Sequence, residues 1–239
     1  MYAGIAKALA KYWSRAHSGN IEVQYKNYLG HGYPSNHTYK ISKEKLVPKH
    51  KLAKRFKKIR ALYPAPLTSL AEIGCSKGFF VLSAHESPHC SRSLGIDITQ
   101  YDIDVCRWVK TSLQNTQSTF ELMQLHELAE QIETFGGPFQ TLLILNTYQY
   151  LYFGSDRFSA RYLSHDLIFK YFRKICSGRI IFNNRIELKD CQNANHVAEA
   201  GPHQKLYSEE HMITAASTYF SCTKHGAIGK YPLYTFDAL

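Results

Sequence analysis

The feature that most constrains this chain is a short apolar segment that ends in a glycine-containing turn. Residues 69–73 carry Glu72 just before their end and run into the Gly-x-x-x-Gly turn 74–78. A helix-forming stretch follows, and a second apolar stretch at 94–98 places Asp97 25 residues after Glu72. In an open α/β sheet, such glycines let the backbone approach a ligand, and a carboxylate after the second strand binds a ribose diol. The pattern therefore predicts a nucleoside-binding site.

The glycine spacing distinguishes between two classes of nucleoside ligand. A dinucleotide pyrophosphate is bound by Gly-x-Gly-x-x-Gly at a helix N-terminus, and the middle glycine is absent here. Glu72 would repel a pyrophosphate but can pair with an ammonium group. The acid-x-Gly-x-x-x-Gly turn resembles motif I of class I S-adenosylmethionine (SAM) methyltransferases, many of which have a second glycine where this chain has Ser76. The alternative is an ordinary strand–turn–helix junction of another α/β fold.

The resemblance implies SAM as cofactor and assigns candidate binding residues. Glu72 and the backbone of Gly74 and Gly78 would hold the methionine end. Asp97 would accept both ribose hydroxyls, because a carboxylate has two acceptor oxygens. The remaining cofactor-binding candidates lie in the same turn or just after strands: Cys75, Ser76, Phe79, Ile98 beside the adenine ring, Met123, Gln124 and Asn146.

Candidate catalytic residues follow from the end of the fourth predicted strand, which faces the transferring methyl group in this family. Residues 146–152 lack the Asn/Asp-Pro-Pro-Tyr/Phe motif of N-methyltransferases that act on amide or ring nitrogens, and no Lys-Asp-Lys-Glu tetrad of ribose 2′-O methylation is recognisable in the sequence. Transfer from a sulfonium needs proximity, alignment and, for a hydroxyl acceptor, a base. We predict Tyr148 as an aromatic wall beside the cationic methyl donor, and His126 and His203 as candidate bases. A structural role is the alternative for all three.

The rest of the chain alternates strands with helices, as a doubly wound sheet requires. The predicted strands are 67–73, 93–98, 119–125, 140–145, 179–183 and a pair within 220–236. The predicted helices are 79–84, 101–113, 126–134, 164–176 and 208–219, with Gly178 ending the fourth. We therefore expect a seven-stranded, mostly parallel α/β sheet with an antiparallel C-terminal hairpin. The methyltransferase domain would span 67–239, after a basic helical extension or lid at 1–66.

Charge is concentrated in the extension. Residues 1–66 hold 14 Lys and Arg against two acidic residues, a net charge of +12, whereas residues 67–239 hold 15 against 17. Residues 49–60 predict an amphipathic helix whose basic outer face includes Lys54, Arg55, Lys57 and Lys58. That face is either a solvated surface or a contact for an anionic partner. We also predict a helix at 3–15 and a turn-rich loop at 28–37 that could reach the active site.

Composition excludes several classes of protein. No apolar run approaches the roughly 20 residues of a membrane helix, so we expect no membrane partner. Six scattered cysteines without a Cys-x-x-Cys pair predict reduced thiols and a cytoplasmic protein. His85, His89 and Cys90 are interpreted as loop residues, so no metal site is expected.

Three functional hypotheses remain. The first is SAM-dependent methylation of an oxygen or nitrogen of a small molecule. The second is modification of RNA, with residues 43–60 as the phosphate contact; residues 95–100 are similar to a Gly-Ile-Asp-x-Thr-Gln stretch of tRNA wobble-uridine carboxymethyltransferases. The third is a SAM-binding regulatory protein that has lost its chemistry. The acceptor atom and the oligomeric state are left open.

Overall fold

The computed structural model describes residues 20–156 and 160–239, which form two compact units. The boundary between the units lies between Phe56 and Lys57, inside a helix. The helix predicted at 3–15 lies outside the described residues.

The described part of the first unit contains a β-hairpin as well as helices. Its elements are α2 (Ile21–His31), η1 (Ser35–His37), β1 (Tyr39–Ser42), β2 (Lys45–Pro48) and the start of α3 (His50–Arg60). The hairpin turns at Lys43 and Glu44, which both have positive φ. The predicted helical extension therefore has helices α2 and α3, and it also contains a hairpin that was not predicted. The expected loop at 28–37 is wrong in part, because α2 continues to His31.

Helix α3 is amphipathic, as expected, with Leu52 and Ile59 fully buried. Arg55, however, is only 4% exposed and does not belong to the basic outer face. Its guanidinium donates to the Nε2 atom of His37, which lies 2.5 Å away. The apolar pattern could not reveal this buried arginine, because its hydrogen-bond acceptor is a ring nitrogen of a residue 18 positions away in the sequence.

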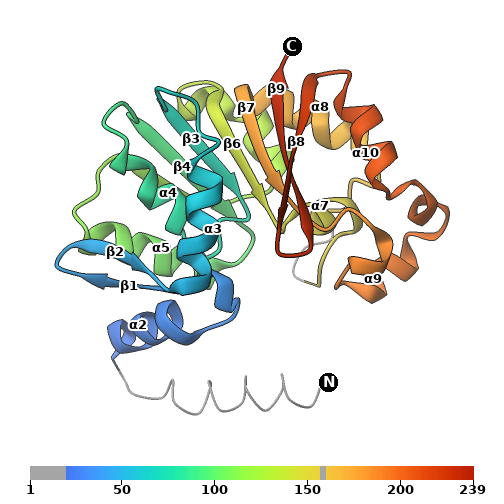
Figure 1. Ribbon diagram of the computed structural model, residues 1–239. Helices are drawn as coiled ribbons and strands as arrows, with labels where there is room; N and C mark the ends of the chain where they lie inside the picture. Colours follow the sequence, from blue (N-terminus) through green and yellow to red (C-terminus); the bar gives the residue numbers. More distant parts are fainter. Residues whose placement is uncertain (1–19, 157–159) are drawn as a thin grey trace. The chain divides into compact units, whose positions relative to one another are not determined.

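The second unit is a seven-stranded sheet (Figure 1). Its strands are β3 (Ser69–Ile73), β4 (Arg92–Asp97), β5 (Ser118–Leu122), β6 (Phe139–Leu145), β7 (Cys176–Asn183), β8 (Phe220–Ile228) and β9 (Tyr231–Ala238). Their order is β5-β4-β3-β6-β7-β9-β8. The first five strands pair in parallel, and β9 is antiparallel to both of its neighbours. The predicted sheet with its C-terminal hairpin is therefore confirmed.

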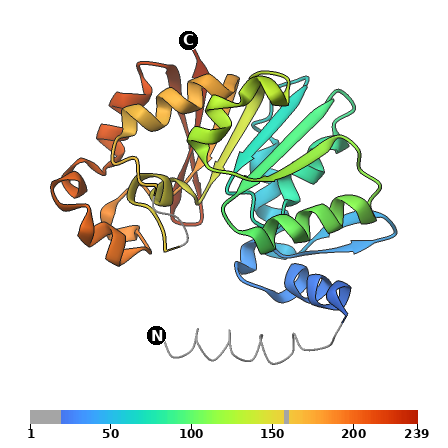
Figure 2. The same cartoon turned by 180° about the vertical axis from the view of Figure 1, so that it is seen from behind.

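Helices connect these strands and cover the sheet. They are α4 (Phe79–Ser83), α5 (Gln100–Ser112), α6 (Leu125–Glu130), α7 (Tyr148–Phe153), α8 (His165–Ile175), α9 (Ala194–Glu199) and α10 (Glu209–Ala216), with short turns η2 (Ala84–Glu86), η3 (Ile132–Phe135), η4 (Leu188–Asp190) and η5 (Gly201–Leu206). Helix α8 packs against both α6 and α10, on the face that is in front in Figure 2. Within the described ranges, no helix is long and apolar enough to span a membrane.

Gly178 lies inside β7 and does not end the preceding helix, which corrects the sequence-based prediction. Helix α8 ends at Ile175, and β7 begins at the next residue. The β6–β7 register shifts here, because β7 has one more residue than β6 between consecutive pairs. A Cβ on Gly178 would lie 2.6 Å from the carbonyl oxygen of Gln140. The glycine is therefore needed for a bulge where two backbones approach closely.

An aromatic cluster forms the core beneath α7 and α8. The Tyr148 hydroxyl lies 2.6 Å from His165 Nδ1, and the two rings are stacked with an interplanar angle of 3°. His165 Nε2 lies 3.0 Å from the carbonyl oxygen of Leu206. Because a carbonyl only accepts, Nε2 carries the proton and Nδ1 accepts from Tyr148. Burial lowers the pKa of His165 from its ordinary 6.5 to about 4, so the ring is neutral at pH 7.

We predict that this histidine makes the protein less stable as the pH falls from about 6.5 to about 4. In this window His165 binds a proton in the unfolded chain but not in the folded protein. The contribution of neutral His165 to stability is therefore complete above pH 6.5 and declines below it. The loss should approach roughly 3 kcal/mol at pH 4. Urea unfolding at several pH values in this range should show that the free energy of unfolding depends less on pH in the double variant Tyr148→Phe/His165→Phe than in the wild type. The core variant Phe153→Leu should lower stability by a similar amount at every pH, and an unchanged slope in the double variant would refute the assignment.

Candidate functional site

The turn after β3 is held against the end of β4 by paired backbone contacts. The amides of Gly74 and Cys75 both donate to the Ile96 carbonyl oxygen, at 2.9 and 3.0 Å. Gly74 has φ +72°, and a Cβ there would lie 2.4 Å from Thr147 Oγ1. Only glycine satisfies both the left-handed backbone and the close approach of the residue that follows β6. The turn therefore joins the carboxyl ends of β3, β4 and β6.

Asp97 is the acidic group at this junction. Its Oδ2 accepts from the Ser76 amide at 2.9 Å, and its Oδ1 accepts from the Thr99 amide at 3.0 Å. Ser76 reaches this position with φ +48°. Burial raises the pKa of the Asp97 carboxyl, and hydrogen bonds from Ser76, Thr99 and Ile98 oppose that shift. A carboxylate of this kind is a suitable acceptor for the hydroxyls of the predicted ribose contact.

Several predicted cofactor residues in and around this turn are buried. Cys75 is 1% exposed, and its thiol hydrogen bonds with Cys106. Phe79 is 3% exposed in the first turn of α4. Gly78 precedes that helix with φ +71°, and a Cβ there would lie 2.8 Å from Cys106 Sγ. Glu72, inside β3, is 1% exposed.

Asn146 follows β6 directly and adopts φ +63°. Its amide donates to the Asn183 carbonyl oxygen at 2.9 Å. Its side-chain Oδ1 is buried and, within the described part of the chain, accepts no hydrogen bond. A buried acceptor without a donor is costly, so this atom indicates a place for a polar ligand group.

Asn184 positions this end of β6, and the sequence analysis did not identify it. Its Oδ1 accepts from the amides of Thr147 and Tyr148 at 2.7 and 2.9 Å, and its Nδ2 donates to the Ile144 carbonyl oxygen at 2.6 Å. The side chain is fully buried. The available signal was an asparagine pair directly after an apolar strand, at the edge where α/β proteins bind ligands.

The third predicted part of the cofactor site lies after β5. The Met123 amide donates to the Asp97 carbonyl oxygen at 3.1 Å, which places this residue beside the strand that carries Asp97. The Gln124 amide donates to Glu127 Oε2 at 2.6 Å and begins α6. Ile98 is half-buried directly after β4.

The three predicted catalytic residues have different surroundings. Tyr148 is fully buried and belongs to the aromatic core, so packing accounts for its side chain. The Tyr162 hydroxyl accepts from the His126 amide at 3.1 Å and forms a second hydrogen bond, 3.0 Å long, with ring Nδ1 of the same histidine. His203 is half-buried in η5, and its carbonyl oxygen accepts from the Tyr152 hydroxyl at 3.1 Å. The contacts that join Gly74, Ser76 and Asp97 therefore do not include these three side chains.

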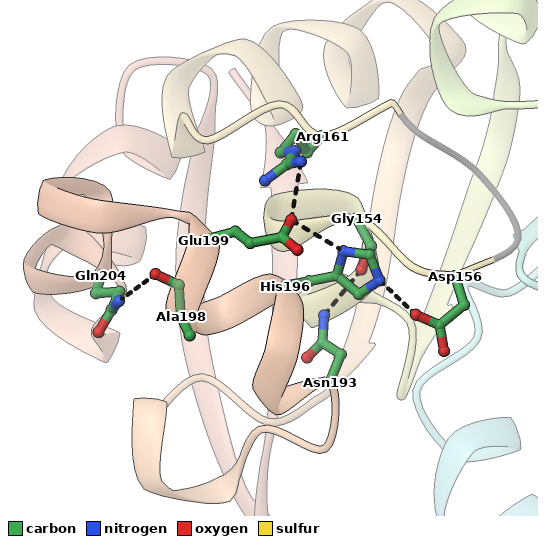
Figure 3. Close-up of polar contacts among 8 residues, drawn as sticks. All are labelled: Gly154, Asp156, Arg161, Asn193, His196, Ala198, Glu199 and Gln204. Atoms are coloured by element: carbon green, nitrogen blue, oxygen red, sulfur yellow. Dashed lines mark hydrogen bonds and ion pairs between the residues drawn. The ribbon is translucent and has the colours of Figure 1, made fainter.

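Ion pairs connect helix α9 to residues that follow α7, as Figure 3 shows. His196 Nε2 lies 2.7 Å from an Asp156 carboxylate oxygen, and its Nδ1 lies 3.8 Å from Glu199. Glu199 also pairs with Arg161 at 3.1 Å. The segments after β6 and β7 are thus joined, and both lie at the end of the sheet where those strands terminate (Figure 1).

The hydrogen-bond acceptors at this edge of the sheet match the ribose hydroxyls and the ammonium group of SAM. The turn between β3 and α4 bends through two glycines, the Asp97 carboxylate can accept from hydroxyls, and the Asn146 Oδ1 atom can accept from an ammonium.

Comparisons with known proteins agree with this fold. No protein-family model and no curated protein matches the sequence. Among solved structures, the chain is similar to the N-methyltransferase NodS from Bradyrhizobium japonicum WM9, with a TM-score of 0.52 and 14% identity over 78% of this chain and 96% of that one. NodS has also been solved in complex with S-adenosyl-L-homocysteine (SAH).

Two larger proteins contain a similar part. The bifunctional kinase-methyltransferase WbdD gives a TM-score of 0.52 with 15% identity, over 77% of this chain and 38% of its own. EvdMO1 gives 0.53 with 14% identity, over 76% and 40%. This chain therefore spans well under half the length of both. The sheet order and these similarities show that the chain has the fold of the class I SAM-dependent methyltransferases.

Proposed function

We propose that this protein is a SAM-dependent methyltransferase that methylates an oxygen or nitrogen of a small molecule. The observation that carries the proposal is the fixed Asp97 carboxylate beside the Gly74–Gly78 turn, with the unsatisfied Asn146 Oδ1 across the same edge of the sheet. The fold similarity to NodS, named as an N-methyltransferase, supports it.

The chain's own residues then have distinct tasks. Asp97 orients the ribose by accepting hydroxyl protons, and Asn146 accepts from the ammonium of the methionine end. The Asn184 bridge keeps the backbone after β6 in place. When bound, SAM supplies an activated methyl group on a sulfonium, so the protein contributes mainly proximity and alignment. His126 and His203 are retained as candidate bases for a hydroxyl acceptor.

RNA modification is the second candidate, because the net charge of +12 in residues 1–66 suits a polyanion. Residues 67–239 have two more acidic than basic residues and supply no such excess. Because the predicted methyltransferase domain has no excess of basic residues to bind a polyanion, a small-molecule acceptor is favoured. A SAM-binding protein without catalysis is the third candidate, which would bind SAH but transfer no methyl group.

We expect SAM and SAH to bind and NADH not to bind. The turn places Glu72 before its first glycine and lacks the middle glycine of a pyrophosphate site. Isothermal titration calorimetry with each ligand would check this. Micromolar binding of NADH with no signal from SAM would reject the proposal.

Replacing Asp97 by Asn should weaken SAH binding by about 10- to 100-fold, because hydrogen bonds to a charged acceptor are worth roughly 1.5–3 kcal/mol. Asp97→Asn keeps one acceptor oxygen and serves as the milder variant. Asp97→Ala should also lower thermal stability, since it leaves the Ser76 and Thr99 amides without their acceptor. Calorimetry and thermal unfolding separate the two effects. Unchanged SAH affinity in Asp97→Asn would mean that the ribose is held elsewhere.

The exposed lysines of α3 distinguish between the two acceptor classes. If the acceptor is a small molecule, the triple variant Lys51→Gln/Lys54→Gln/Lys57→Gln should bind SAH as the wild type does. Neither the wild type nor the triple variant should then show salt-dependent binding of bulk tRNA. Arg55 is kept because it is buried. Filter binding of bulk tRNA at several salt concentrations provides the measurement. A wild-type salt slope that falls by nearly one per lysine removed would favour RNA instead.

A further inference from the structure

Arg185 lies two residues beyond Asn183, at the carboxyl end of β7. Its Nε donates to the Tyr231 hydroxyl at 3.0 Å, and its Cζ lies 4.7 Å from the centre of the Tyr231 ring. Its carbonyl oxygen accepts from the buried Tyr207 hydroxyl at 2.6 Å. Backbone and side chain are therefore both fixed, while the two terminal guanidinium nitrogens make no hydrogen bond within the described residues.

The charge of Arg185 is not neutralised. The residue is half-buried, and across residues 20–156 and 160–239 no carboxylate oxygen lies within 4.0 Å of its guanidinium. The acids that follow it have other partners: Asp190 pairs with Lys230 at 2.6 Å, and Glu187 accepts from the Glu209 amide at 3.4 Å. A partly desolvated cation is costly without a counter-charge. Its fork of donors matches a carboxylate or phosphate.

Arg185 also lies next to the backbone that borders the proposed cofactor site. Asn184, its neighbour in sequence, holds the amides of Thr147 and Tyr148, and Thr147 directly follows Asn146. The carboxyl ends of β6 and β7 are adjacent, because the two strands pair up to Leu145 and Asn183. An anion held by Arg185 would therefore lie on the β7 side of the site, away from Asp97 on β4.

We propose that Arg185, oriented by Tyr231, binds a carboxylate or phosphate group of the small-molecule acceptor. The inference rests on the proposed function and narrows its substrate class to anionic small molecules. An arginine that only packs on Tyr231 would bind no anion, so anion binding separates the two roles.

The test is titration of the SAH-saturated protein with inorganic phosphate and, separately, with acetate, at constant ionic strength and followed by NMR. We expect at least one of the two anions to bind with millimolar affinity. The anion that binds more tightly indicates whether the acceptor carries a phosphate or a carboxylate group. Arg185→Gln should weaken it at least tenfold, and Arg185→Lys, which keeps the charge but loses the fork, should have an intermediate effect. The matched control Arg173→Gln, at the end of α8, should bind like wild type.

SAH affinity, measured in every variant, keeps the two proposals apart. If the wild-type protein does not bind SAH, the proposed function itself is overturned. Two results would overturn the role of Arg185 while SAH binding stays normal. One is no anion binding up to about 50 mM, which corresponds to a binding free energy weaker than about 2 kcal/mol. The other is equal anion binding by Arg185→Gln and the wild type. Displacement of phosphate by micromolar tRNA would overturn the small-molecule assignment.

Discussion

The Ile96 carbonyl oxygen accepts hydrogen bonds from two successive amides, those of Gly74 and Cys75, and the candidate site depends on this contact. It turns the chain after β3 toward β4, so that the next amide, from Ser76, meets the Asp97 carboxylate. The same turn brings Gly74 against Thr147, where a side chain would not fit. Three strand ends are thereby held together by one backbone turn, and its geometry requires glycine.

The sequence was sufficient to predict the sheet, because its buried parallel strands are continuous apolar runs and its turns carry glycines at diagnostic spacing. The structure brings the Gly74 turn and Asp97 together at one edge of the sheet, and their predicted roles in binding stay predictions. Tyr148 shows the limit of this approach: an aromatic residue after β6 suits either a ligand wall or the core. Its partner His165, from a later helix, was not foreseeable from local pattern.

Other features depended on contacts between residues far apart in the sequence. Arg55 is buried against His37, Gly178 faces the Gln140 carbonyl, and Asn184 bridges to the end of β6. None of these partners lies within a helical turn or a strand repeat of the residue concerned. Periodicity assigns a residue to a face of an element, but it does not say which polar group from another element meets that residue there.

The position of β9 between β7 and β8 has a consequence for synthesis of the chain. Strand β8 leaves the ribosome before β9, yet within the sheet β9 is its hydrogen-bonded neighbour. Until β9 emerges, β8 therefore has no strand to pair with, and the edge of β7 stays open. In a folding intermediate without β9, the open edge of β7 and the unpaired strand β8 are therefore the surfaces that pair most readily with another chain.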